Sequence, residues 1–186
     1  MTFSDATHAP VISPRYDGTT IMLHWLTAGL VALVWFIAQV IDFFPRGMPR
    51  TSARSMHIVL GVVLVVIVLA RLFWRFTQGR RIVVERSPME IAAKAGHGIL
   101  YLLLIGVLVA GLGFEWVRGD SIFGLFAIPQ FDPVNARALR ETVGDVHETL
   151  ANAILVVAGL HAVMALGHHY VLRDGVLRRM MPGWCR

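Results

Sequence analysis

The chain has 186 residues, of which 56% are hydrophobic and 16% are charged, with a formal net charge of +5 and a single cysteine. Soluble domains are about 25% charged, so this composition indicates a small integral membrane protein without a separate soluble domain. The one cysteine, Cys185, excludes a disulfide within the chain, a cysteine-ligated iron–sulfur cluster and a structural cysteine zinc site.

The order of polar and apolar segments predicts an all-α, integral membrane four-helix bundle over residues 20–175. Residues 1–19 form a polar tail with no apolar run, so we expect a cytoplasmic segment and no cleavable signal peptide. Four apolar stretches follow, each near the roughly 20 residues that a membrane-spanning helix requires. They cover residues about 21–44, 56–76, 97–117 and 147–171. A basic cytoplasmic tail over residues 176–186 ends the chain.

Two of the loops between the apolar stretches have some pattern of their own. The second loop, residues 77–95, is basic. The segment MEIAAKAGH at its end is amphipathic enough to form an interfacial helix that leads into the third apolar stretch. The third, residues 118–146, is the longest and mixes apolar residues with Pro129 and Pro133. We expect it to form a structured cap with a short helix around Asn135 to Thr142.

Basic side chains predict the orientation, because cytoplasmic segments carry an excess of lysine and arginine. If the N-terminus is cytoplasmic, eleven of the 17 basic residues lie on the inner side and six on the outer side. Both termini are therefore expected in the cytoplasm of a bacterial cell, with the helices in the inner membrane. The basic residues cluster at the ends of the apolar segments, which indicates membrane topology and no nucleic-acid partner.

The last apolar stretch, HETLANAILVVAGLHAVMALGHHY, holds four histidines. From His147 to His161 an α-helix turns through about 1400°, about 40° short of four turns, and rises about 21 Å. The two side chains therefore lie on nearly one face, near opposite membrane surfaces. Ionisable groups inside a membrane are costly and usually functional, so the pair suggests ligands for two cofactors at two depths. The alternative is that each histidine only hydrogen-bonds a neighbouring helix.

The other membrane histidines can be placed by depth. His57 opens the second stretch on the outer side, so it pairs naturally with His147. An inner pair requires His161 together with either His24 or His97, and depth leaves both possibilities open. Two histidines on opposite sides of a flat ring suit a six-coordinate b-type haem, which needs no covalent attachment motif. Zinc is the rival metal, but its ligands converge on one point and these histidines lie at two depths.

His168 and His169 lie at the inner end of the fourth stretch, where Arg71 and Arg75 of the second stretch are also expected. Histidine titrates near neutral pH, so His168 suits proton delivery to a reduced quinone. These residues are equally typical of ordinary anchoring at the membrane interface.

Several motifs of the chain resemble the prokaryotic cytochrome b561 family. They are LHWL, MHIVLGVVLVVIVLARLFWR, GHGILYLLL and VHETLANAILVVAGLHAVMALGHHYVLRDGVLRRMMP, which span nearly the whole chain after Arg15. HETLAN with LHA, HHY and RMMP points to the superoxide oxidase branch. The resemblance implies four membrane helices, two b haems, and electron transfer from superoxide on the outer side to ubiquinone near the inner side.

Carried onto this sequence, the resemblance implies that one haem is held by His24 and His161 and the other by His57 and His147. It implies that His97 is not a ligand, although the family also has a histidine there. The loop sequence GRRIVVER is richer in arginine than in the relatives, which puts any site residue within it in doubt.

Together these features favour a superoxide:ubiquinone oxidoreductase with no obligatory protein partner. Superoxide is an anion, so an electropositive outer surface would speed its capture. The candidates for that surface are Arg46, Arg50, Arg54, Arg118, Arg137 and Arg140. One alternative is a cytochrome b subunit that docks to a separate dehydrogenase or hydrogenase. Another is a bundle without haem whose histidines are structural.

Overall fold

The computed structural model describes residues 15–78, 88–131 and 136–183, which are mostly helical. Its elements are α1 (Gly18–Val40), the 3-10 turn η1 (Ile41–Phe43), α2 (Met48–Thr77), α3 (Pro88–Arg118), β1 (Ser121–Ile122), β2 (Phe126–Ala127), α4 (Ala136–Gly167), the π-helical turn η2 (His168–Leu172) and the 3-10 turn η3 (Leu177–Met180). The four long helices are each long and apolar enough to cross a membrane. The expected all-α membrane bundle is therefore confirmed.

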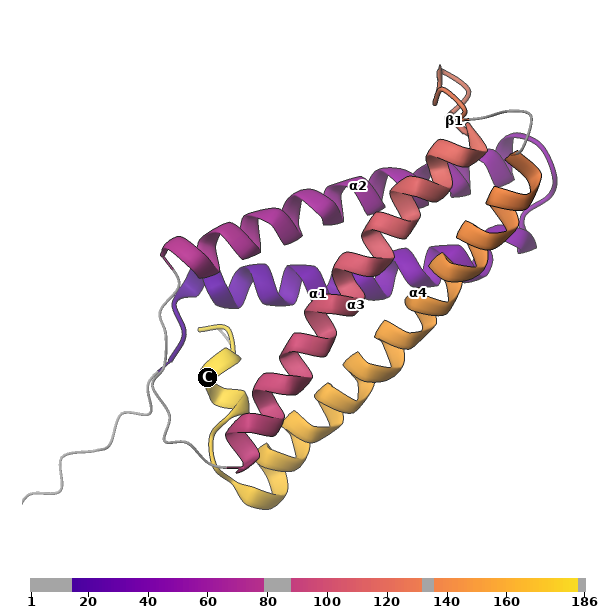
Figure 1. Ribbon diagram of the computed structural model, residues 1–186. Helices are drawn as coiled ribbons and strands as arrows, with labels where there is room; N and C mark the ends of the chain where they lie inside the picture. Colours follow the sequence, from indigo (N-terminus) through magenta and orange to yellow (C-terminus); the bar gives the residue numbers. More distant parts are fainter. Residues whose placement is uncertain (1–14, 79–87, 132–135, 184–186) are drawn as a thin grey trace, which may run out of the picture.

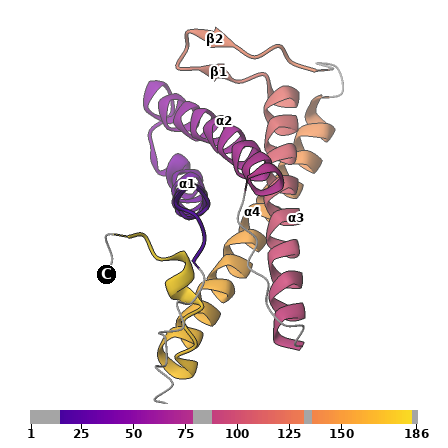
Figure 2. The same ribbon diagram turned by 90° about the vertical axis from the view of Figure 1, so that its left-hand side faces the viewer.

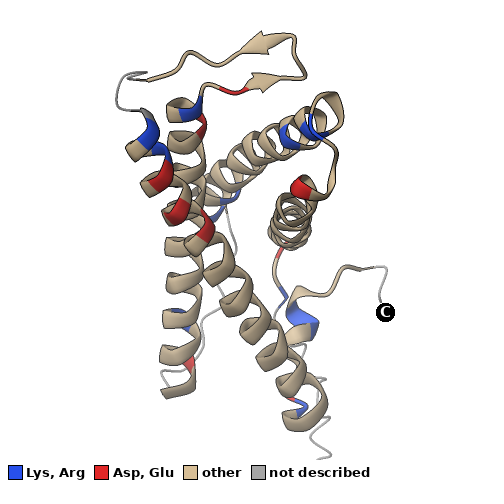
Figure 3. Cartoon of the chain, turned by 90° about the vertical axis from the view of Figure 1, so that its right-hand side faces the viewer, with Lys and Arg blue, Asp and Glu red and all other residues tan. Residues whose placement is uncertain are grey.

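The long helices pack as two pairs, α1 with α2 and α3 with α4, and the pairs cross one another (Figure 1). A small core of Leu64, Val68, Leu104 and Ile154 joins α2, α3 and α4. Most other large apolar side chains face outward, and Leu102, for example, is 72% exposed. Charged residues gather toward the helix ends and leave long apolar stretches between them (Figure 3). Outward-facing apolar side chains of this kind are stable against lipid, so the chain is a multi-pass membrane protein.

Local residues explain where the helices begin. Asp17 caps α1, because its Oδ1 accepts the N–H of Thr20 at 2.9 Å. Proline opens both α2 and α3, where a missing N–H costs nothing. As a result α2 begins at Met48 and not near residue 56, and α3 begins at Pro88 and not near residue 97. The expected amphipathic lead-in is thus continuous with α3.

The loop after α3 forms a cap. In it β1 and β2 pair as a short antiparallel hairpin, which lies against the N-terminal part of α2 (Figure 2). Ser55 of α2 is fully buried there, and its hydroxyl accepts the N–H of Phe123 at 2.8 Å. Residues 132–135 lie outside the described residues, so the start of the expected short helix is not described. Residues 136–142 form the first turns of α4.

The C-terminal segment folds back onto the start of α1. The indole N–H of Trp25 donates to the carbonyl of Met180 at 2.8 Å, and Arg15 donates to the carbonyl of Met181 at 2.6 Å. These bonds join both ends of the described chain at one end of the bundle (Figure 1). We call this the inner end, and the end that carries the hairpin the outer end.

Candidate functional site

His57 of α2 and His147 of α4 face one another toward the outer end of the bundle. Their ring centroids are 6.2 Å apart and the ring planes are nearly perpendicular, at 88°. The Nδ1 atom of His57 lies 3.0 Å from the carbonyl oxygen of Val34, and that of His147 lies 3.0 Å from the carbonyl oxygen of Val107. A carbonyl can only accept, so each Nδ1 carries the proton and each Nε2 keeps a free lone pair.

The imidazole of His147 is held on several sides by α3. A Cβ atom added to Gly111 would lie 2.9 Å from Cε1 of His147, so only glycine leaves room for the ring. The ring of Phe114 stacks on His147 with centroids 6.3 Å apart and an interplanar angle of 26°. Together with the Val107 carbonyl, these contacts fix both the position and the tautomer of the ring.

The geometry of this outer pair suits a bis-histidine metal centre. Two imidazoles that bind one metal from opposite sides, at about 2 Å each, have ring centres about 6 Å apart. The 6.2 Å separation of His57 and His147 matches that distance. Metal-bound histidines also usually donate their second ring N–H to a carbonyl or carboxylate, as both of these do.

The inner group is arranged differently. His161 of α4 lies beside His97 of α3, with ring centroids 5.2 Å apart, so a metal between these two rings would need them to separate by about 1 Å. His24 of α1 accepts a hydrogen bond at Nδ1 from Nη2 of Arg71, at 3.1 Å. The guanidinium groups of Arg71 and Arg75 both lie over the ring of Tyr101, at 5.3 and 5.8 Å from its centroid. The inner histidines therefore lie in a markedly basic surrounding.

His168 lies in η2 and pairs with Asp174 through its Nδ1 atom. Partial burial alone would raise the pKa of the Asp174 carboxyl. The hydrogen bonds from His168 and from the N–H of Val176 outweigh that effect, so the pKa lies below its ordinary 3.8. The pair fixes the ring of His168 and leaves its Nε2 atom free of this contact. Asp174 lies beyond the end of η2, so no regular helix spacing in the sequence relates it to His168.

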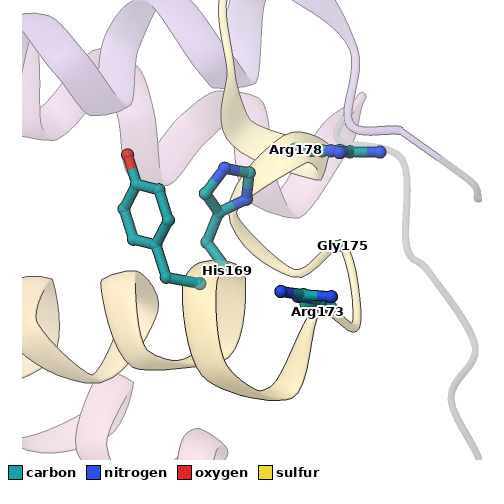
Figure 4. Close-up of a pocket in the computed structure, with 5 residues that line it drawn as sticks. His169, Arg173, Gly175 and Arg178 are labelled. Atoms are coloured by element: carbon teal, nitrogen blue, oxygen red, sulfur yellow. The ribbon is translucent and has the colours of Figure 1, made fainter.

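A cavity of about 280 Å³ lies along the same segment of the chain (Figure 4). It is lined by His169, Tyr170, Arg173, Gly175 and Arg178. His169 and Gly175 directly follow His168 and Asp174 in the chain, so the cavity and the pair occupy the same turn at the inner end of α4. Its two arginines make the cavity basic.

Three of the six outer arginines pair with carboxylates. Arg54 and Arg118 both pair with Asp120, at 3.6 and 3.1 Å, and Arg50 pairs with Asp42 at 3.5 Å. Arg118 also lies 5.3 Å from the ring centroid of Phe114, the ring that stacks on His147. A direct series of contacts thus leads from Arg118, whose side chain is 20% exposed, to the outer histidine pair.

The chain is similar to several known proteins over most of its length. The profile of the family described as prokaryotic cytochrome b561 matches residues 15–183. The chain is 34% identical to a probable superoxide oxidase CybB of Yersinia pestis, over 90% of this chain and 96% of the relative. It is 31% identical to cytochrome b561 homolog 2 of Escherichia coli strain K12, over 90% and 91% of the two chains. It is also 30% identical to cytochrome b562 of Cereibacter sphaeroides, over 90% and 96%.

Proposed function

The chain belongs to the prokaryotic cytochrome b561 family, and we propose that it is a superoxide:ubiquinone oxidoreductase of the bacterial inner membrane. Family membership implies that the protein binds haem b and transfers electrons. In this proposal two superoxide anions are oxidised to two molecules of dioxygen on the periplasmic side. Ubiquinone takes up the two electrons, together with two protons, near the cytoplasmic side. Two bound b haems supply the reversible one-electron chemistry that links these reactions.

The outer histidine pair is the observation that best supports the electron-transfer part of this proposal. His57 and His147 have the separation and the tautomer that bis-histidine ligation requires. We assign the inner ligands to His24 and His161, as the resemblance to the family implies. The 5.2 Å between the ring centroids of His97 and His161 is shorter than the about 6 Å expected for two imidazoles on one metal, which agrees with leaving His97 out. In this assignment His97 lies beside the inner site without binding it.

Superoxide as the donor is supported by the relative from Yersinia pestis, whose name states that activity, although other relatives are named only as cytochromes. At the outer end, Arg54 and Arg118 share the single carboxylate of Asp120, which leaves a local excess of positive charge. Glu115 also lies within electrostatic range of both arginines. We therefore confine the expected electropositive surface to Arg118 and its contact with Phe114, directly above His147.

At the inner end, His168 is the residue that we propose to hydrogen-bond the quinone and to deliver a proton to it. Its Nδ1 atom is held by Asp174, so Nε2 is free to face a quinone carbonyl. Histidine side chains are common proton donors in catalysis. The adjacent basic cavity offers space for a quinone headgroup on the same turn of the chain (Figure 4).

The function is tested by purifying the full chain in detergent with no other protein. Superoxide is generated enzymatically, and reduction of a soluble ubiquinone analogue is followed with and without superoxide dismutase. We expect quinone reduction that dismutase abolishes and that His57→Ala removes. If the purified protein binds haem but reduces quinone only after a dehydrogenase or hydrogenase is added, the protein is an electron-transfer subunit and the superoxide proposal is wrong.

A further inference from the structure

The segment of residues 121–131, which contains the β1–β2 hairpin, is apolar although much of it lies at the surface. Its sequence is SIFGLFAIPQF, without a charged residue. Leu125 between the strands is 91% exposed, and Phe126 of β2 is 63% exposed. Gln130, the longest polar side chain of the segment, turns back to α3 and donates to the carbonyl of Val117 at 3.0 Å. Exposed apolar patches of this kind mark sites of contact with a membrane or another protein.

The contacts with α2 place the hairpin at the boundary between the polar and the apolar part of that helix. Residues 48–55 of α2 are mostly polar, and the apolar run begins at Met56. Ser55, the last residue before that run, is fully buried, and its hydroxyl accepts the N–H of Phe123 at 2.8 Å. It follows the first residue of α2 by seven positions, so this bond lies about 10 Å inside the end of the helix. Leu125 follows Phe123 by two residues, so their Cα atoms are at most about 7 Å apart.

The contacts with α3 place the base of the hairpin at a similar boundary. Asp120, directly before β1, pairs with Arg54 of α2 and with Arg118 at the end of α3, at 3.6 and 3.1 Å. The half-exposed indole of Trp116 contacts the ring of Phe131, with centroids 4.9 Å apart. Tryptophan is enriched where membrane helices meet the headgroups, and charged residues lie just beyond that level. Both helices therefore hold the hairpin at the depth of a membrane interface.

We propose that the β1–β2 hairpin lies in the interfacial layer of the outer leaflet, with Leu125 and Phe126 at the boundary between headgroups and acyl chains. Its partner is the lipid surface, because the hairpin is attached where the apolar run of α2 begins and runs crosswise to α3 (Figure 2). The segment carries no charge, so its insertion depends on apolar burial and not on the charge of the headgroups. The inference goes beyond the proposed function and depends on neither substrate nor acceptor.

The test measures the depth of the hairpin with nitroxide spin labels on the full chain, purified and reconstituted into vesicles. Cys185→Ser removes the single native cysteine, and Leu125→Cys, Leu102→Cys or Glu141→Cys then introduces one site for the label. Leu102, exposed near the middle of α3, is the reference for lipid, and Glu141, exposed near the start of α4, is the reference for water. Power saturation compares collisions of each label with oxygen, which concentrates in lipid, and with a neutral nickel chelate, which stays in water.

The ratio of oxygen to nickel collisions at position 125 should lie between the two references and clearly above that at position 141. It should be the same in zwitterionic vesicles and in vesicles that contain anionic lipid. Phe126→Cys, on the adjacent strand residue, should give the same result and replaces Leu125→Cys if that variant does not assemble.

A ratio at the hairpin equal to that at position 141 would place the hairpin in water and overturn the inference. An immobile label that is shielded from both reagents would also overturn it, because a second copy of the chain or another protein would then cover the hairpin. A lipid-like ratio found only with anionic lipid would show that nearby arginines, and not the apolar segment, determine the depth, which again contradicts the proposal.

Discussion

At the scale of single residues, the most constrained contact of the candidate site is that between Gly111 and His147. Gly111→Ala would place a methyl group 2.9 Å from Cε1 of His147, so the imidazole must turn away from the Val107 carbonyl. Alanine also stabilises a helix relative to glycine by about 0.5–1 kcal/mol, so the helix itself should gain stability. We expect the variant to lose one haem, or to show altered ligation of one haem by electron paramagnetic resonance, while remaining folded.

Gly113→Ala is the matched control for that variant. The added methyl group would lie 4.0 Å from Cγ1 of Val143, an ordinary contact distance, so haem content and ligation should be unchanged. If Gly111→Ala also leaves haem content and ligation unchanged, then the position of the His147 ring does not determine haem binding.

The assignment of histidines to haems gives a second prediction at this scale. His57→Ala and His24→Ala should each remove a different haem, because the two side chains lie in different groups of the bundle. His97→Ala should leave both haems bound, since His97 is not a ligand in the proposed assignment. Optical spectra and haemochrome analysis of the three variants measure this directly, and loss of a haem from His97→Ala would contradict the inner pairing.

The candidate histidines themselves were predictable from the sequence, because ionisable residues inside apolar stretches are rare and their spacing on a helix is regular. The groups that orient them were not predictable in the same way. The partners of His57 and His147 are backbone carbonyls, which every residue has, and only the packing of one helix on another selects Val34 and Val107. Tyr101 did carry a signal, since it follows His97 by four residues and so lies on the same helix face.

At the scale of elements, the inner end of α4 depends on the pair formed by His168 and Asp174. The pKa of Asp174 is lowered in the folded protein, so its carboxylate contributes stability fully above the ordinary value of 3.8. That contribution is lost as the pH falls through the lowered value. Asp174→Asn should therefore reduce the thermal midpoint slightly at neutral pH, by an amount that corresponds to less than about 1 kcal/mol, since the pair is partly exposed.

Thermal unfolding in detergent at several pH values checks this prediction. The difference between the wild-type protein and Asp174→Asn should narrow as the pH falls below 3.8. Asp145→Asn, on α4 toward the outer end, is a control with the same change of charge and no bond to His168. A difference that grows as the pH falls would have the wrong sign for a carboxylate of lowered pKa.

The membrane helices could be predicted from hydropathy, whereas their ends and the short elements could not. The sequence stretches 48–55 and 136–146 are polar, so hydropathy assigned them to loops, yet they extend α2 and α4 beyond the apolar core. The β1–β2 hairpin has only two residues in each strand and depends on the buried hydroxyl of Ser55, a contact between segments far apart in sequence. The π-helical turn at His168 likewise has no recognised sequence signal.

At the scale of the whole molecule, the orientation in the membrane determines which reaction occurs on which side. The even number of spans and the contacts of Trp25 and Arg15 with the C-terminal segment favour both ends on one side. The excess of basic residues expected on that side, eleven of 17, predicts that it faces the cytoplasm. A phosphatase reporter fused after Arg186, which is active only in the periplasm, should be inactive. An active reporter would reverse every inner and outer assignment.

If ubiquinone is reduced at the inner end, its two protons come from the cytoplasm while its electrons come from the periplasmic side. Each turnover then moves negative charge inward and makes the inner side more negative. Protein reconstituted into vesicles in the physiological orientation should therefore generate a membrane potential when superoxide and quinone are supplied. A potential-sensitive dye measures this, and an uncoupler is the control. No potential despite steady quinone reduction would place quinone and superoxide on the same side.

With superoxide oxidised at the outer end and quinone reduced at the inner end, a His168→Ala variant should affect only one of the two half-reactions. Reduction of the bound haems by superoxide should be unchanged, because His168 lies at the opposite end of α4 from His147. Reoxidation by quinone should slow by about 10²-fold or more, the usual contribution of a positioned proton donor. Stopped-flow spectroscopy resolves both phases, and His169→Ala shows how much of the loss comes from the adjacent cavity. If His168→Ala reoxidises as fast as the wild-type protein, the His168–Asp174 pair serves only to fix the inner end of the helix.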